Sequence, residues 1–424
     1  MDKKTLFDEN QVSTTTDKPT LNARKLSFRQ VPTIFHKCFE LPEYLKPYDK
    51  NVFHREVSKK IGTTVNIKNK KLLSFWYCDY LGLSENKKIK SIIKKHIDKY
   101  STGISSSRII AGTTSSHRKL EKKLAEFIGG EDCIVYILGY MANIGTIQTI
   151  VKSNETVIVD AQSHASIIDG CNLAKINGAK IIPYKHNNMS DLNIKLNKYA
   201  TNGTLIVTDG VFSMDGDIAK LNEIHRLAKK YNAGVMVDDA HGLGMLGQFG
   251  SGTVEHFNLQ NKIDLTMGTL SKSVPLLGGY IVGKKEIIEY LKGTSRSYLF
   301  CLSLPPYIVE AAIESIEIIK NGIQLRKQLW ENTKYLKSNL LNLKFELTNS
   351  ETPIISILTR DYNKTFKLAK ILENMGFFID AIIYPAVKKN SSRLRIILTA
   401  NHSKNDIDQL LFALQKTAKS LNLI

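Results

Sequence analysis

Cysteine is scarce in this chain, and the few that occur are not arranged in pairs. Among 424 residues there are five, widely scattered and never in CxxC spacing: Cys38, Cys78, Cys133, Cys171 and Cys301. This pattern argues against both a disulfide framework and a zinc site. We therefore expect reduced thiols and no bound metal.

Long apolar runs are also lacking. The longest mostly apolar stretch, residues 133–151, is interrupted by Gly139, Asn143, Gly145 and Gln148, and the first thirty residues contain no apolar core of a secretory signal. We expect a cytoplasmic protein without a transmembrane segment. Peripheral contact with a membrane stays open.

Acidic residues are outnumbered, since 59 Lys and Arg face 40 Asp and Glu and give a formal charge of +19. Such an excess fits nucleic acid, an anionic membrane surface or a polyanionic substrate such as coenzyme A. The lysines are spread along the chain, and no nucleic-acid-binding motif is visible. We therefore predict no nucleic-acid partner.

Three regions follow one another along the chain. Residues 1–65 are polar and basic and are expected to form an N-terminal arm, with a short helix near 41–45. Residues 66–305 alternate apolar runs with amphipathic patterns, which predicts an α/β domain with a mostly parallel sheet. Residues 306–424 are expected to form a smaller α+β domain.

The elements of both domains can be assigned from the pattern. Five buried strands are predicted in the large domain, at 134–138, 157–159, 205–207, 235–237 and 265–267, with helices such as 141–151 and 222–231 between them. The small domain is expected to begin with one long helical stretch at 307–341. It continues with strands at 354–358, 377–383 and 394–398 and helices at 365–375 and 405–421.

Small and polar residues follow each predicted strand of the large domain. Ligands of parallel sheets bind at the carboxyl ends of the strands, so these residues are expected to share one site. Lys272 lies just after the strand at 265–267 and precedes an apolar segment. A desolvated lysine has a lowered pKa and can form an imine with a carbonyl group. This predicts a Schiff base between Lys272 and pyridoxal 5′-phosphate (PLP).

The other requirements of PLP have candidates too. Asp238 ends a buried strand and can pair with the pyridinium nitrogen, whereas Asp239 faces the opposite side and is expected to be structural. His164 can stack on the ring, and His241 can reach its phenolic oxygen. For either histidine alone, an ordinary buried histidine is at least as good an interpretation.

Phosphate and carboxylate groups need their own partners. Gly139 and Tyr140 open a predicted helix whose N–H groups can hold the phosphate, with Thr269 and Ser271 adding hydroxyls. Arg395 is a candidate clamp for a substrate carboxylate, whereas its neighbour Arg393 is expected to face solvent.

In order, HASIIDG (164–170), TDGVFSMDGD (208–217), VMVDDAHGLG (235–244), GTLSKS (268–273) with GGY (278–280), and RLRIILTANH (393–402) resemble the α-oxoamine synthase family. The resemblance covers roughly residue 71 to the C-terminus. It implies a fold-type I PLP transferase with a seven-stranded, mostly parallel sheet. It also implies a homodimer and the decarboxylative condensation of an amino acid with an acyl-CoA.

The resemblance also assigns roles to individual residues. It makes Lys272 the Schiff-base lysine and the base for the α-proton, and Asp238 the pyridinium partner. It makes His164 the stacking histidine, while His241 and Ser213 address the cofactor oxygen O3′. Arg395 would hold the carboxylate of the amino acid.

Within the family, HASIIDGC, YKHNNM (184–189) and TSRSYLFCLSLPP (294–306) are most similar to bacterial serine palmitoyltransferases, enzymes of sphingolipid biosynthesis. Two departures concern the site. Cys78 replaces an expected asparagine near the substrate, which puts the choice of amino acid in doubt. The segment 273–279 is less glycine-rich than is usual after the lysine.

Several alternatives remain beside an acyltransferase that uses serine and a long-chain acyl-CoA. Activities of the 8-amino-7-oxononanoate synthase, 2-amino-3-ketobutyrate CoA ligase, 5-aminolevulinate synthase and quorum-signal synthase types belong to the same family. Acyl carrier protein could replace coenzyme A. An aminotransferase or lyase on the same fold, and a regulatory PLP-fold subunit without activity, are the remaining hypotheses.

Overall fold

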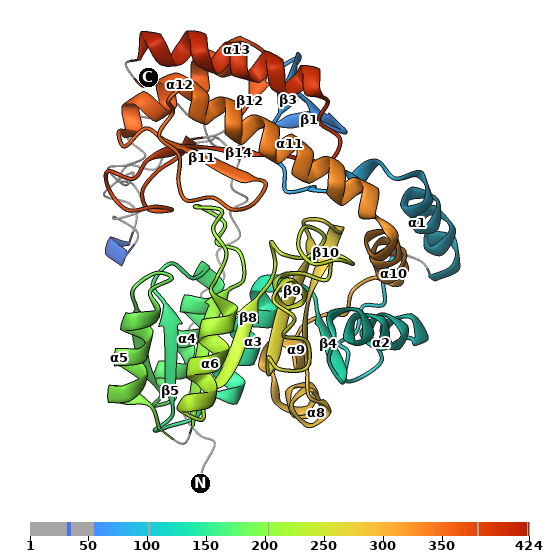
Figure 1. The fold of residues 1–424 in the computed structure, drawn as a ribbon. Coiled ribbons are helices and arrows are strands. Elements are labelled where there is room, and N and C mark those ends of the chain that lie inside the picture. The colour runs from blue at the N-terminus through green and yellow to red at the C-terminus, as the bar shows by residue number, and fades with distance from the viewer. Residues whose placement is uncertain are drawn as a thin grey trace, which may run out of the picture. The chain divides into compact units, whose positions relative to one another are not determined.

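The computed structural model describes residues 32–34, 55–100, 102–201, 203–379, 381–421 and 423. The chain divides into two units, Met1–Arg55 and Glu56–Ile424. The short helix expected at 41–45, and Cys38, lie outside the described residues. All elements discussed below belong to the second unit (Figure 1).

A seven-stranded sheet is the centre of this unit. Its spatial order is β4 (Asp132–Tyr136), β10 (Pro275–Gly283), β9 (Leu265–Ser271), β8 (Gly234–Asp238), β7 (Thr204–Asp209), β5 (Thr156–Asp160) and β6 (Lys180–Tyr184). β10 runs antiparallel to β4 and β9, and the other neighbours are parallel. The predicted fold class, an α/β sheet that is mostly parallel, is confirmed.

The five predicted apolar runs lie in β4, β5, β7, β8 and β9, and two strands have no such run. β6 is an edge strand that exposes Lys180 and Pro183, and an edge strand tolerates a proline. β10 contains Gly278 and Gly279 in its middle, where its pairing with β9 is irregular. Both strands therefore lack the continuous apolar pattern of a central parallel strand.

Helices cover the sheet according to the alternation of its side chains. Val157 and Val159 face α3 (Gly139–Ile150), α4 (Ala165–Ile176) and α8 (Lys285–Thr294). Ile158, between them, faces α5 (Met189–Tyr199) and α6 (Leu221–Lys230). The remaining helices of this part are short or lie toward β4: α1 (Lys87–Tyr100), α2 (Ser115–Ile128), α7 (Thr253–His256), α9 (Arg296–Leu299) and the 3₁₀ turn Leu83–Glu85.

The long helical stretch expected at 307–341 is wrong in one respect, because it consists of two helices. α10 (Pro306–Asn321) ends and α11 (Ile323–Asn342) begins at Gly322. The Arg326 guanidinium donates to the carbonyl of Ile319 at 2.5 Å and to that of Gln248 at 2.6 Å. It is thereby a second donor to the Ile319 carbonyl at the break, which also accepts from the backbone N–H of Gly322 at 3.0 Å.

Two small sheets complete the unit. One has the order β11 (Ile354–Leu358), β14 (Arg393–Ile397), β13 (Ala381–Ile382), and the other has the order β1 (Val57–Ile61), β2 (Thr64–Ile67), β3 (Lys70–Ser74), β12 (Phe377–Phe378). The single strand expected at 377–383 is therefore wrong, because this segment pairs first with β3 and then with β14. Residues 57–65, expected in the arm, contribute instead to a sheet.

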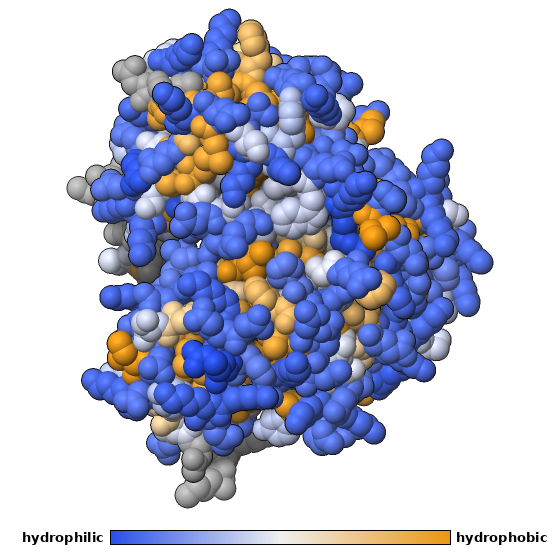
Figure 2. All heavy atoms as spheres, viewed as in Figure 1, coloured by the Kyte–Doolittle hydropathy of each residue, from blue (hydrophilic) through white to orange (hydrophobic). Residues whose placement is uncertain are grey.

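The last two helices are α12 (Tyr362–Asn374) and α13 (Lys404–Ser420), and α13 begins at a capping box formed by Ser403 and Asp406. The face of the molecule drawn in Figure 2 is mainly hydrophilic, with small apolar patches. In the part of the chain that the structure describes, no helix has the length and apolar character needed to cross a membrane.

Candidate active site

A cavity of about 290 Å³ lies at the carboxyl ends of the parallel strands, beside the first turns of α3 and α4. It is lined by Leu138, Gly139, Tyr140, His164, Ser166, Asp209, Val211, Ser213, Asp238, Ala240, His241, Met267, Thr269, Ser271 and Lys272. All nine residues predicted to bind the cofactor are in this set. Cys78 and Arg395, the two predicted substrate residues, are not.

Lys272 is half-buried directly after β9. Loss of hydration lowers its pKa, and the carboxylates of Asp238 and Asp209 and the thiol of Cys78 oppose that effect without cancelling it. The net pKa lies below that of an ordinary lysine, so more of the amine is neutral and nucleophilic near neutral pH.

Asp238 is held at the end of β8 by two N–H donors. The backbone N–H of Ala240 donates to Oδ1 at 3.0 Å, and Nδ2 of Asn143 donates to Oδ2 at 2.7 Å. Asp239 points the other way, where its carboxylate accepts from the backbone N–H of Thr253 at 2.6 Å. The two adjacent carboxylates thus lie in different environments, and of the two only Asp238 lines the cavity.

The pKa values of both histidines are lowered, which favours their neutral forms. Partial loss of hydration lowers the pKa of His164, which caps α4 with its Nδ1 accepting from the backbone N–H of Ser166 at 3.3 Å. Burial also lowers the pKa of His241 well below its usual value, and Nδ1 of His241 is 2.7 Å from the hydroxyl of Tyr80. Neither ring adds a positive charge to the cavity at neutral pH.

The start of α3 approaches the sheet closely. A Cβ atom on Gly139 would lie 2.9 Å from the Met267 side chain and 3.1 Å from that of Thr269. The Thr269 and Ser271 hydroxyls are 2.8 Å apart at the same place, and the first turn of α3 has no side-chain cap. The N–H groups of this first helical turn and the two hydroxyls form a cradle suited to a phosphate group.

Arg395 lies at the other side of the site, on β14. Its Nη1 donates to the Ser213 carbonyl at 2.9 Å, and its guanidinium lies 4.8 Å from the ring centre of Trp76. Its Nε is buried and has no hydrogen-bond partner among the described residues. Arg393 does not face solvent as expected, since it is buried and pairs with Asp215.

The family can be decided by comparison with known proteins. Residues 70–414 match the family described as aminotransferase class I and II. This chain belongs to that family. An 8-amino-7-oxononanoate synthase of Thermoanaerobacter pseudethanolicus is 43% identical over 84% of this chain and 90% of the relative. A serine palmitoyltransferase of Sphingobacterium spiritivorum is 39% identical over 88% and 92%.

Solved structures agree with this assignment. A serine palmitoyltransferase from S. paucimobilis with a bound PLP–myriocin aldimine has a TM-score of 0.87 at 31% identity and covers 92% of this chain and 99% of that one. An 8-amino-7-oxononanoate synthase from Francisella tularensis has a TM-score of 0.71 at 28% identity, with coverage of 82% and 98%. The fold is that of fold-type I PLP transferases, and the predicted α-oxoamine synthase resemblance is confirmed.

The protein is therefore a PLP-dependent α-oxoamine synthase, and its cavity fits that cofactor. The cradle at Gly139 suits the phosphate, Asp238 suits the pyridinium nitrogen, and Lys272 suits the aldehyde carbon. These residue assignments are predictions from the geometry and the resemblance.

Several residues of the site escape the sequence-based prediction: Trp76, Tyr80, Asn143, Ser166 and Asp209. Asp209 ends β7 next to Asp238 in the register of the sheet, so the rule that selected Asp238 could have found it. Burial raises its pKa well above the usual range. Trp76 and Tyr80 follow β3 and contact Arg395 and His241 through tertiary packing, and nothing in the local pattern marks them.

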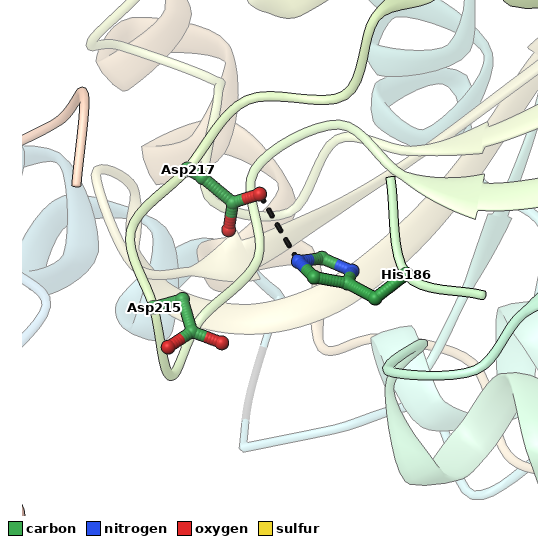
Figure 3. A group of neighbouring side chains, drawn as sticks. All are labelled: His186, Asp215 and Asp217. Atoms are coloured by element: carbon green, nitrogen blue, oxygen red, sulfur yellow. Dashed lines mark ion pairs between the residues drawn. The ribbon is translucent and has the colours of Figure 1, made fainter. Parts of the chain in front are cut away.

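A second polar cluster lies outside the cavity and contains His186, Asp215 and Asp217, whose possible ligand atoms are within 4.8 Å of one another (Figure 3). Nδ1 of His186 is 3.0 Å from Asp160 and its Nε2 is 3.1 Å from Asp217. Burial alone would lower the pKa of His186, but these two carboxylates raise it to about 10. With both ring nitrogens paired and Asp215 bound to Arg393, the cluster is an ion-pair network.

Proposed function

We propose that this protein condenses L-serine with a long-chain acyl-CoA and releases CO2, as a serine palmitoyltransferase does. The observation that carries the proposal is one cavity containing the amine of Lys272, with the unpaired Nε of Arg395 beside it. The amine, with its lowered pKa, suits removal of the proton from the α-carbon of an amino acid. The free edge of the guanidinium suits binding of the amino acid's carboxylate.

Each residue then has a defined task. Bound PLP would act as the electron sink for the bond broken at the α-carbon. Lys272 removes the α-proton, for which its lowered pKa suits it. Arg395 holds the carboxylate of the amino acid, and Trp76 supports the guanidinium from its face.

A second candidate function is that of an 8-amino-7-oxononanoate synthase, because a relative with that name is 43% identical. The two activities differ in the amino acid and the acyl chain that they join, and both would use the same site residues. Cys78 is half-buried, and its thiol is close enough to influence the pKa of Lys272. It is therefore the residue whose side chain we expect to bias the choice of amino acid.

A matrix of substrates tests both candidates. Purified protein loaded with PLP is given single amino acids together with acyl-CoAs or acyl carrier proteins of different chain length, and release of free thiol is measured. Serine with a long-chain acyl-CoA should give the highest kcat/KM. Thiol release that does not depend on any amino acid would refute the proposal, and a keto acid product would indicate an aminotransferase.

We also propose that the protein acts as a homodimer. Leu138 and Tyr140, which line the cavity, are 40% and 38% exposed, and Ile110, Phe300 and Leu302 on neighbouring segments are 79%, 74% and 58% exposed. Exposed apolar residues around a site support contact with a second copy. Light scattering at micromolar concentration should give twice the chain mass of 47.7 kDa, and a monomer would contradict this.

We propose a cytoplasmic location as well. The four cysteines in the described part of the chain are free thiols, which fits a reducing compartment. Fractionation of cells that produce the protein checks this point.

A further inference from the structure

One buried amide group connects the two residues expected to contact the ring of the cofactor. Asn143 lies on α3 and has no exposed surface. Its Nδ2 donates to Oδ2 of Asp238 at 2.7 Å and to Oγ of Ser166 at 2.8 Å. Oγ of Ser166 is in turn 2.7 Å from Nδ1 of His164. The chain of contacts runs from the edge of the expected ring position to the histidine expected on its face.

The direction of each hydrogen bond follows from the chemistry of the groups. A carboxylate only accepts, so Asn143 must present its NH2 group to Asp238. The second hydrogen of that NH2 group goes to Ser166 Oγ, which leaves the single hydroxyl hydrogen of Ser166 for Nδ1 of His164. The backbone N–H of Ser166 points to the same Nδ1 at 3.3 Å. Nδ1 therefore carries no proton, and a neutral His164 must be protonated at Nε2.

The carbonyl oxygen of the Asn143 amide, Oδ1, is in an unfavourable environment. Oδ1 of Asn143 is buried and has no hydrogen-bond partner among the described residues. A buried carbonyl without a partner is unfavourable, and an apolar side chain at this position would avoid the penalty. The two donors of Asn143 are thus the property that distinguishes it from an apolar residue in the same space.

We propose that Asn143 is a positioning residue that fixes both the Asp238 carboxylate and the Nε2–H tautomer of His164. The inference rests on the proposed function, since it takes Asp238 and His164 as the groups that address the cofactor ring. Asn143 itself does not line the cavity. It acts by making the position of one residue depend on that of the other.

Three substitutions test two branches of this network separately: the contact of Asn143 with Asp238, and its contact with His164 through Ser166. Ser166→Ala removes only the branch to His164. Asn143→Ala removes both, and Asn143→Asp keeps the shape but replaces the donor with an acceptor that faces Asp238. Gln148→Ala, on the same helix and half-buried, is the control. The affinity for PLP, the pH titration of its bound absorption band and the ¹⁵N shifts of the His164 ring are measured on the holoenzyme, with His164→Asn identifying the His164 signals.

Wild type should show the Nε2–H tautomer. Asn143→Ala and Asn143→Asp should weaken PLP binding about tenfold or more and shift the titration of the absorption band. In Ser166→Ala only the longer bond from the backbone N–H of residue 166 still favours the Nε2–H tautomer of His164, so the share of the Nδ1–H tautomer should rise while the affinity changes less. Gln148→Ala should match wild type. A melting temperature checks folding. If Asn143→Ala does not fold, Asn143→Asp decides the contact with Asp238 and Ser166→Ala decides the contact with His164.

Contrary results fall into two kinds. An unchanged tautomer in Ser166→Ala, or unchanged PLP affinity and titration in both Asn143 variants, overturns this inference while the proposed function stands. If wild type itself does not bind PLP, the proposed function fails, and that outcome is visible before any variant is compared.

Discussion

Arg395 gives the clearest test of how the substrate is held. Its guanidinium uses Nη1 for the Ser213 carbonyl and keeps a buried Nε free, so a carboxylate can receive two parallel bonds from Nε and Nη2. Arg395→Lys replaces this fork with a single ammonium group. One charge-assisted hydrogen bond is lost, which is worth about 1.5–3 kcal/mol. The Kd for the amino acid should therefore rise roughly 10-fold to 150-fold.

The assay is a titration of the holoenzyme with amino acid, followed by the absorption change of bound PLP. The affinity for PLP should stay near the wild-type value, because the guanidinium lies outside the cavity lining. Arg360→Lys, an exposed residue paired with Glu346, serves as control. If Arg395→Lys binds the amino acid as tightly as the wild type does, Arg395 is not the carboxylate clamp.

Three further predictions concern other parts of the molecule. Glu121→Gln leaves Arg108 buried without its charged partner and should lower the free energy of unfolding by about 3–5 kcal/mol in urea denaturation. The folded pKa of His186, about 10, exceeds its usual 6.5. The stability advantage over His186→Gln should thus be full below pH 6.5 and disappear as the pH rises through 10. Gly279→Ala places a Cβ 2.5 Å from the backbone at the start of α3 and should weaken PLP binding about tenfold, while Gly293→Ala, which meets nothing within 4 Å, should not.

The sheet could be predicted where the strands are apolar throughout. β5, β7 and β8 are buried from end to end or nearly so, and a run of three apolar residues marks each of them. β10 could not be predicted in the same way, because Gly279 packs against the start of α3 and Gly278 against Leu270 and Leu304 instead of contributing side chains of their own. The break between α10 and α11 at Gly322 could not be predicted from the sequence pattern either. The apolar pattern resumes at once in α11, and the Ile319 carbonyl at the break accepts from the backbone N–H of Gly322 and from Arg326.

The residues of the site could be predicted where they follow the carboxyl end of a predicted strand. Lys272, Asp238 and His164 follow predicted strands, and the parallel sheet brings them to one edge. Tyr80 reaches His241 from 161 positions away in the sequence, and Asn143 lies inside a helix, where no strand-end rule applies. Such residues enter the site through tertiary packing, which the local sequence pattern does not specify.

The central claim is that the α-carbon of the amino acid, after losing its proton, bonds to the acyl carbon as the thiol leaves, and that the carboxyl group is then lost as CO2. Its most direct test uses amino acid labelled with ¹³C in the carboxyl group, and measures ¹³CO2 and free thiol from the same reaction. The account predicts equal amounts of both from the wild type and neither from Lys272→Ala. Thiol release without labelled CO2, or a labelled keto acid in its place, would contradict it.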